Sequence, residues 1–377
     1  MKITSIEVGI VTVPLRSEFA TAHGSVSVQR SALARVRTDE GYVGWGNVDP
    51  TPGYSEMSVA RVVSTVTESL VSALLGSDPM NIAAAMRRMD AQCPAGNEAK
   101  ALVEMALLDL KGKALGVPVW SLLGGKVRDE VAFNAWIGTV PPQQAAADAA
   151  EWCRRGFRSA KIKVGGKFRE DLDRVAATRA AVGDKMRLRV DANEGLDVEG
   201  AIRLARALAP YQISLFEQPV ARTELHGLAR IRRESPIPIM ADESVRDARS
   251  VIEIIRLEAA DLIKVKVMKQ GGMLRTLQLA SIAEAAGLGV ILGHGFGLWT
   301  STLAEVHVAA ANLSILDGCE AVGPLKMAGE VVKHPPDMGH GSIAVPDAPG
   351  LGVEPEEGLL ARYGWDGSMT ERRGGRS

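Results

Sequence analysis

The chain has 377 residues, of which 46% are hydrophobic and 24% are charged, and its formal net charge is −1. This composition is typical of a globular protein, and the length suffices for a barrel of about 250 residues with a smaller domain beside it. Because basic and acidic residues balance, no global field attracts nucleic acid or an anionic membrane surface, and we expect neither as a partner. No run of about 18 apolar residues is present that would span a membrane.

Cysteine usage and the N-terminal segment favour a cytoplasmic protein. The three cysteines, Cys93, Cys153 and Cys319, are far apart and match neither a disulfide framework nor a CxxC metal site. Residues 1–15 contain no long apolar run and no small-residue cleavage site, so they indicate a strand rather than a signal peptide. We therefore expect free thiols in a reducing compartment.

The first third of the chain predicts an α+β domain over residues 1–125. Residues 2–14 and 31–46 alternate apolar and polar side chains, as the strands of an antiparallel sheet do. Glycine and proline residues at 116–125 indicate the end of the domain. Three stretches with helical periodicity, at 57–75, 80–92 and 98–115, lie between these strands and residues 116–125.

From residue 131 the pattern changes to short β-branched runs that alternate with amphipathic stretches, at a pitch of about 25 residues. This alternation predicts a TIM-type (β/α) barrel over residues 126–320. An open doubly wound sheet is less suitable, because no GxGxxG turn follows any strand. Residues 321–377 are expected to return to the first domain, with the last dozen residues disordered. The expected barrel strands are 131–137, 159–164, 187–192, 213–217, 237–242, 261–267, 288–293 and 314–319.

Charged residues end five consecutive barrel strands. They are separated by steps of 28, 26, 25 and 24 residues, and each step equals one βα unit. We therefore expect their side chains to ring the carboxyl end of the barrel, where active sites of this fold are built. The five residues are Lys163, Asp191, Glu217, Asp242 and Lys266.

The three carboxylates of this set predict a metal site. A single aspartate at a strand end is often only a helix cap, but three in register on adjacent strands are seldom structural. Without histidine or cysteine beside them, Asp191, Glu217 and Asp242 form an oxygen-rich set that suits Mg²⁺ or Mn²⁺ better than Zn²⁺. A divalent cation would also offset the repulsion that raises the pKa of crowded carboxyl groups.

The lysines predict acid–base chemistry. In Lys161-Ile-Lys163 both lysines face the same side of the strand. Neighbouring ammonium groups lower one another's pKa, which allows one of them to act as a base near neutral pH. Lys163 and Lys266 flank the carboxylate strands and are expected to approach one substrate carbon from opposite faces. Lys264 and Lys269 either take part in this chemistry or point outward into solvent.

The order of these motifs resembles the enolase superfamily and, within it, the muconate lactonizing enzyme subgroup of the mandelate racemase/muconate lactonizing enzyme family. The resemblance covers nearly the whole chain, and it implies a (β/α)7β barrel with an α+β capping domain formed by the N-terminal third and the C-terminal tail. It also implies a homo-oligomer, either a dimer or an octamer. The motifs are Lys161-Ile-Lys163, Asp191-Ala-Asn193, Glu217-Gln-Pro219, Ala241-Asp242-Glu243-Ser244 and Lys266-Val-Met-Lys269-Gln-Gly271-Gly272.

The resemblance implies that Mg²⁺ binds to Asp191, Glu217 and Asp242. In that case the lysine pair, Lys163 and Lys266, removes the α-proton of a small carboxylate substrate to give a metal-stabilised enediolate. The implied supporting residues are Lys161 beside the base, with Asn193 and Glu243 behind the metal ligands.

The sequence does not decide which of several related reactions follows proton removal. We expect an isomerase, either a muconate cycloisomerase-like enzyme or an amino-acid racemase or epimerase. The alternative is a lyase on the same scaffold, such as an o-succinylbenzoate synthase-like dehydratase. A non-catalytic scaffold protein would be expected to have lost part of the lysine and carboxylate set, which is intact. Asp317 and Glu320 face opposite sides of a strand, unlike the DxD of dipeptide epimerases, which counts against dipeptide substrates.

Five further residues are expected to contact the substrate. Two lie in the segments expected to close over the barrel, 16–28 and 49–56. For His294 the sequence leaves three roles open: substrate contact, proton carrier or structural residue. Phe296 and Trp299 form either an aromatic wall or part of the core. The expected substrate-binding residues are His23, Tyr54, His294, Phe296 and Glu320.

Overall fold

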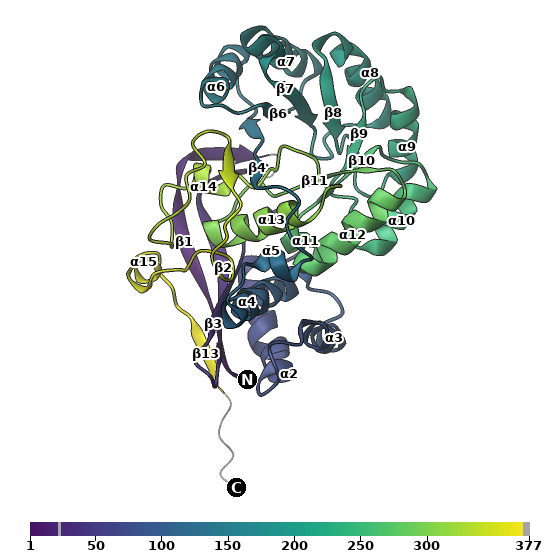
Figure 1. The fold of residues 1–377 in the computed structure, drawn as a ribbon. Helices are drawn as coiled ribbons and strands as arrows, with labels where there is room; N and C mark the ends of the chain where they lie inside the picture. The colour runs from purple at the N-terminus through teal and green to yellow at the C-terminus, as the bar shows by residue number, and fades with distance from the viewer. Residues whose placement is uncertain (22–23, 372–377) are drawn as a thin grey trace.

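The computed structural model describes residues 1–21 and 24–371, apart from the side chains of 19–21, 24–25 and 368–371 (Figure 1). An antiparallel sheet with its helices lies at one end of the molecule and a ring of parallel strands at the other. The expected substrate residue His23 lies outside the described residues.

The N-terminal sheet has the strand order β13-β1-β2-β3, and all of its strands are antiparallel. Alternating apolar residues of the first strands face the helices, and Ile6, Val8 and Val36 are fully buried. The strands are β1 (Ile3–Thr21), β2 (Gly24–Thr38), β3 (Val43–Val48) and β13 (Ser368–Glu371).

The helices of the N-terminal part correspond to the three predicted helical stretches, apart from the short α5, which was not predicted. The first stretch is split, because a π-helical turn, η1 (Val66–Leu70), interrupts it. The long helix α4 is buried on nearly all sides, since it lies between the sheet and the barrel. The helices are α1 (Val59–Thr65), α2 (Val71–Leu74), α3 (Ile82–Gln92), α4 (Asn97–Leu115) and α5 (Val119–Leu122).

Helix α4 connects the two parts of the molecule through its buried Glu104. Glu104 accepts hydrogen bonds from the backbone N–H groups of Met273 (2.8 Å) and Leu274 (2.9 Å), at the start of helix α12 (Met273–Ala285). A carboxylate at a helix N-terminus satisfies N–H groups that have no partner within the helix. The N-terminal part therefore contributes to the stability of a barrel helix.

The barrel contains seven parallel strands in the order β11-β10-β9-β8-β7-β6-β5. They are β5 (Ala135–Ile137), β6 (Ser159–Lys163), β7 (Arg187–Asp191), β8 (Ile213–Glu217), β9 (Ile239–Ala241), β10 (Leu262–Val265) and β11 (Gly289–Leu292). The outer helices are α6 (Pro142–Arg154), α7 (Phe168–Val182), α8 (Val198–Leu208), α9 (Leu225–Glu234), α10 (Ala248–Arg256), α12 and α13 (Trp299–Ala311). Short 3-10 turns, η2 (Gly183–Lys185) and η3 (Ala209–Tyr211), follow α7 and α8.

The last predicted strand, 314–319, is not a regular strand. Instead Ile315 forms a bridge with Val290 of β11, and Cys319 forms one with Phe133, just before β5. Gly318, with φ of 92°, interrupts the extended conformation between the two bridges. The segment still joins the two edges of the sheet and closes the ring.

The C-terminal segment returns to the N-terminal sheet. Its elements are the turn of helix α14 (Gly323–Lys326), strand β12 (Ser342–Ala344), which pairs with β4 (Glu130–Ala132), helix α15 (Glu357–Arg362) and β13. The last dozen residues were expected to be disordered, yet β13 within them pairs with β1. The unpaired edge of β1 offers backbone partners, which explains the additional strand.

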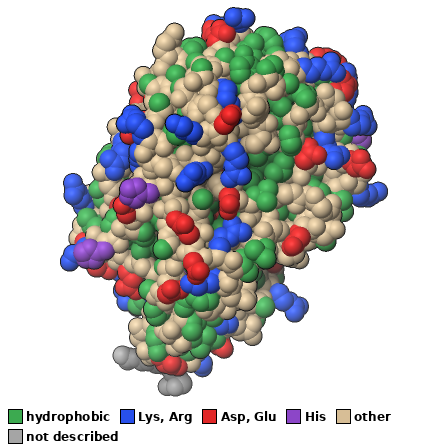
Figure 2. Space-filling view, turned by 45° about the horizontal axis from the view of Figure 1, so that its top comes forward, with side chains coloured by type: hydrophobic (Ala, Val, Ile, Leu, Met, Phe, Trp, Pro, Cys, Tyr) green, Lys and Arg blue, Asp and Glu red, His purple; other side chains and the backbone are tan. Residues whose placement is uncertain are grey.

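The surface is of mixed charge. On the face shown in Figure 2, Lys and Arg side chains are interspersed with Asp and Glu rather than gathered by sign. In the part of the chain that the structure describes, no helix combines the length and the apolar composition that a membrane span requires.

The close approach of α4 to β3 depends on glycine and gives a stability prediction. A Cβ at Gly46 would lie 2.0 Å from the carbonyl oxygen of Leu102, a backbone atom that cannot move aside alone. Gly46→Ala should lower the free energy of unfolding by about 1–3 kcal/mol, as overpacking does. Urea denaturation measures this change. Gly138→Ala is the control, because its nearest neighbour would be 4.0 Å away, at Val140. Equal stability of both variants and the wild type would contradict the prediction.

Candidate active site

A cavity of about 450 Å³ lies at the carboxyl end of the barrel strands. Its walls come from both parts of the molecule, with Tyr54 from the N-terminal part and Lys163, Lys266 and Phe296 from the barrel. Parallel strands end at the same edge, so side chains from distant sequence positions meet there. The size is that of a small-molecule site.

The three predicted carboxylates lie together at this end. Asp191 and Glu217 are the last residues of β7 and β8 and are paired in register, and Asp242 directly follows β9. Each has 1% or less of its surface exposed. Carboxylates are seldom buried to this degree without compensating charge, so the surrounding cations matter for stability as well as for chemistry.

Three lysines inside the barrel lie against Asp191 and Glu217. The Nζ of Lys161 is 3.0 Å from both Asp191 Oδ2 and Glu217 Oε2. The Nζ of Lys163 is 2.7 Å from Asp191 Oδ2, and that of Lys264 is 3.0 Å from Glu217 Oε1. The shared face of Lys161 and Lys163 on β6 agrees with the expectation from their spacing.

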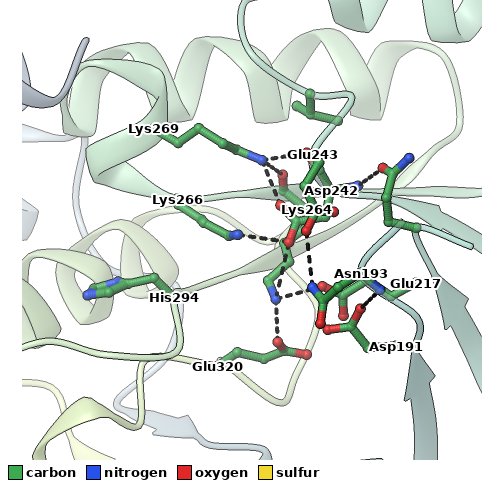
Figure 3. A network of polar contacts seen from close by, with 12 residues as sticks. Asp191, Asn193, Glu217, Asp242, Glu243, Lys264, Lys266, Lys269, His294 and Glu320 are labelled. Carbon is green, nitrogen blue, oxygen red and sulfur yellow. Dashed lines mark hydrogen bonds and ion pairs between the residues drawn. The ribbon is translucent and has the colours of Figure 1, made fainter. Parts of the chain in front are cut away.

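Two further lysines contact Asp242, as Figure 3 shows. The Nζ of Lys266 is 2.8 Å from Asp242 Oδ2, and that of Lys269, on α11 (Val267–Gln270), is 2.7 Å from Oδ1. Neither Lys264 nor Lys269 points into solvent, since both bind carboxylates of the cluster. Lys163 and Lys266 therefore contact opposite members of the cluster, Asp191 and Asp242.

Burial and the cations shift the pKa values of these groups in opposite directions. Burial, together with the neighbouring charge of Asp191, raises the pKa of Glu217 to about 8. Burial would also raise the pKa of Asp191 and Asp242, but the adjacent ammonium groups hold both below the ordinary value. Burial lowers the pKa of Lys269 to about 8, against the attraction of Asp242.

Two amide side chains fix the positions of the carboxylates and of Lys163. Asn193 Nδ2 donates to Glu243 Oε1 at 3.0 Å, and Asn193 Oδ1 accepts a hydrogen bond from Lys163. Gln218 Oε1 accepts from the backbone N–H groups of Asp242 (2.9 Å) and Ser244 (3.2 Å). Asn193 and Gln218 both adopt positive φ, of 41° and 31°, a conformation that non-glycine residues seldom keep unless the surroundings demand it.

Glu320 was expected to contact the substrate, and it lines the cavity. Its carboxylate is also held by three cations: Lys161 at 2.5 Å, Lys264 in a short contact and Arg189 at 3.4 Å. Burial alone would raise its pKa, but these cations hold it well below the usual range. Its main partners are therefore the lysines of the cluster.

His294 lies beside the lysines and joins the two parts of the molecule. Its Nδ1 is 3.2 Å from Glu305 Oε1 on α13, and its Nε2 is 3.6 Å from Asp49 Oδ2, which follows β3. Burial would lower the pKa of His294, but Asp49 and Glu305 raise it to about 9. His294 also lines the cavity, so a substrate contact is compatible with this bridging position.

The remaining expected contacts divide between cavity and core. Tyr54 and Phe296 line the cavity, whereas Trp299 does not line it and is 5% exposed. Sequence reasoning missed Gln218 and Lys326. Gln218 had the weak signal of its place between Glu217 and Pro219, but nothing in the sequence placed Lys326 at the cavity.

The donor set suits a hard divalent cation. It consists of oxygen ligands only, and burial together with the charge of Asp191 raises the pKa of Glu217, a shift that a bound cation would oppose. Within residues 1–21 and 24–371, no three metal-ligating side chains are spaced to hold an ion as they stand, because ammonium groups lie between the carboxylates.

Comparison with known proteins agrees with this geometry. Residues 5–124 match the mandelate racemase/muconate lactonizing enzyme N-terminal domain, and residues 144–359 match the enolase C-terminal domain-like family. N-succinyl-L-Arg/Lys racemase of Bacillus cereus is 33% identical over 361 residues, covering 96% of this chain and 97% of the relative. Its crystal structure superposes with a TM-score of 0.94, covering 98% of this chain and 100% of that one.

Two other relatives are similarly close. Muconate cycloisomerase 1 of Pseudomonas putida is 35% identical over 354 residues, covering 93% of this chain and 94% of the relative. The crystal structure of a dipeptide epimerase from Enterococcus faecalis superposes with a TM-score of 0.90 at 32% identity, covering 94% of this chain and 100% of that one.

The chain belongs to the mandelate racemase/muconate lactonizing enzyme family of the enolase superfamily, as its motifs indicated. A racemase, a cycloisomerase and an epimerase are all isomerases, and the chain is an isomerase of this superfamily. These relatives give no support to the lyase alternative.

The His294 bridge predicts a pH-dependent contribution to stability. Its folded-state pKa of about 9 exceeds the ordinary 6.5, so the stabilisation is fully present below about pH 6.5 and is lost as the pH rises through 9. His294→Asn should therefore destabilise more at pH 6 than at pH 10, by about 3 kcal/mol. Urea denaturation at both pH values measures this difference, with the exposed His226→Asn as control. A loss that is equal at both pH values would mean that the protonated bridge does not form.

Proposed function

We propose that this protein is a Mg²⁺-dependent isomerase that removes the α-proton of a small carboxylate substrate, with Lys163 and Lys266 as its acid–base pair. The observation that carries the proposal is the placement of these two lysines. Each lines the same cavity, and each contacts a different member of one buried carboxylate cluster, at Asp191 and at Asp242.

Asp191, Glu217 and Asp242 are the proposed ligands of Mg²⁺, with Mn²⁺ as an alternative. Support comes from the oxygen-only donor set and from the Enterococcus faecalis dipeptide epimerase, whose crystal structure is a complex with Mg and a dipeptide. Bound there, the metal would supply Lewis-acid stabilisation of the negative charge that develops as the proton leaves. Asn193 and Glu243 are proposed to keep the ligands oriented.

The two lysines divide the proton transfer between the two faces of the substrate. One takes the α-proton, and the other returns a proton from the opposite side, which inverts the stereocentre of a racemase or epimerase substrate. A cycloisomerase would use only one of these transfers. Lys161, between Asp191 and Glu217, is proposed to offset negative charge beside Lys163.

The substrate is proposed to be a small-molecule carboxylate that contacts Tyr54, His294 and Phe296. The named relatives act on N-succinyl-Arg/Lys, muconate and dipeptides, which are all small carboxylates. The domain division at residues 125 and 320, the homo-oligomer and the cytoplasmic location stay predictions.

Deuterium exchange tests the proposed function directly. The protein with Mg²⁺ is incubated in D₂O with N-acylamino acids, proline derivatives, dipeptides and a muconolactone, and proton NMR follows the α-position. Deuterium should appear at the α-carbon of at least one compound, and EDTA should abolish the exchange. Exchange that persists in EDTA would refute the metal requirement. No exchange with any compound would count against the proposed substrate classes.

Removing either proposed base should abolish turnover without unfolding the protein. Lys163→Ala and Lys266→Ala are each expected to lower kcat by at least about 10²–10⁴-fold, the contribution of a positioned general base. Lys167→Ala is the matched control, because Lys167 is exposed and follows the same strand. Circular dichroism checks the fold. Near-normal activity of either base variant would refute the two-lysine mechanism.

Replacing one proposed metal ligand should weaken metal binding and activity together. Asp242→Asn keeps the shape of the side chain but removes a charge, so the Mg²⁺ dissociation constant measured by calorimetry should rise at least about tenfold. The Mg²⁺ concentration that gives half-maximal exchange should rise in parallel. An unchanged dissociation constant would exclude Asp242 as a ligand.

A further inference from the structure

Lys326 ends α14 and reaches the cavity from the C-terminal segment. Its Nζ donates to the carbonyl oxygen of Gly295 at 2.6 Å. The same ammonium group lies 4.7 Å from the ring centroid of Trp136 and 4.6 Å from that of Phe296. A carbonyl and two aromatic faces therefore hold this cation in one place, as such faces do by cation–π attraction.

This cation lines the same cavity as two of the cluster lysines. Trp136, Phe296, Lys161 and Lys163 line the cavity together with Lys326. Burial, and then the positive charges of Lys163 and Lys161, lower the pKa of Lys326 well below the ordinary value. A negatively charged ligand placed here would relieve the repulsion among these ammonium groups.

Nothing in the proposed proton transfer requires Lys326. The α-carbon of the substrate has to lie between Lys163 and Lys266, and its carboxylate beside Asp191, Glu217 and Asp242. Lys326 comes from a different segment of the chain, and Gly295 with the two rings fixes its position. It is therefore a cation that lines the cavity in addition to those that the proposed proton transfer uses.

We propose that Lys326, held between Trp136 and Phe296, binds a second carboxylate at the far end of the substrate. This inference rests on the proposed function and narrows its substrate class to acids with two carboxylates. A cationic end group would be repelled by Lys161, Lys163 and Lys326. A neutral apolar end would desolvate the three ammonium groups further without adding negative charge. The rings of Trp136 and Phe296 form apolar walls for the methylene groups between the two carboxylates.

A pair of ligands that differ only at the far end tests the inference. One is an N-acyl amino acid whose acyl chain ends in a carboxylate (N-succinyl), and the other ends in the isosteric carboxamide. Calorimetry in Mg²⁺ measures binding of both to the wild type, to Lys326→Met and to the exposed control Lys333→Met. The wild type and Lys333→Met should bind the carboxylate form about 10- to 100-fold more tightly, the range for a charge-assisted hydrogen bond. In Lys326→Met that preference should disappear, so that the two ligands bind with about equal affinity.

Exchange kinetics separate binding from chemistry. With the carboxylate ligand, Lys326→Met should raise KM for α-proton exchange and leave kcat within about twofold, because Lys326 takes no part in proton transfer. Lys326→Arg keeps the charge and should retain part of the preference, and thermal unfolding of both variants checks the fold.

The possible outcomes distinguish this inference from the proposed function. Equal binding of the two ligands by the wild type, binding of neither, or a preference that survives in Lys326→Met would overturn the inference. If the preference depends on Lys326 but no ligand exchanges its α-proton, the carboxylate site stands and the enolisation function fails for this substrate class. If exchange occurs with the carboxamide as readily as with the carboxylate, the function stands and the inference is wrong.

Discussion

Charge compensation inside the barrel is the constraint on which the rest of the site depends. Three carboxylates with almost no exposed surface stand at neighbouring strand ends, and such a group is unstable unless cations of matching number and position surround it. The lysines of β6, β10 and α11 provide that charge. The same arrangement that stabilises the fold places the amines of Lys163 and Lys266 at one cavity.

The polar links between the two parts of the molecule serve the same cavity. Asp49 accepts hydrogen bonds from Ser31 and from Ser301 of the barrel (2.7 Å for the latter), and it lies near His294. Glu104 holds the start of α12. Directional contacts of this kind fix the orientation of one part over the other more narrowly than apolar packing does. These contacts thereby hold the cavity residues of the N-terminal part in a fixed position over the barrel.

The barrel and its carboxylate cluster were predictable because both follow from strand periodicity: residues one βα unit apart on parallel strands must meet at one end. Features that depend on the path of the chain after helix α13 could not be predicted. The position of Lys326 depends on how residues after 320 cross the barrel, and Gly318 turns the predicted last strand into two bridges. His294 likewise contacts Asp49, a residue distant in sequence, so no local pattern could decide its role.

The pairing of β13 with β1 has a consequence for biosynthesis. The N-terminal sheet leaves the ribosome first, yet one of its four strands is made after the whole barrel. Until then β1 keeps an open edge, which is prone to pair with other chains. The barrel residues are thus translated while the sheet that adjoins them is still incomplete. Conditions that slow or truncate synthesis near the C-terminus should therefore expose β1 to aggregation even when the barrel is already folded.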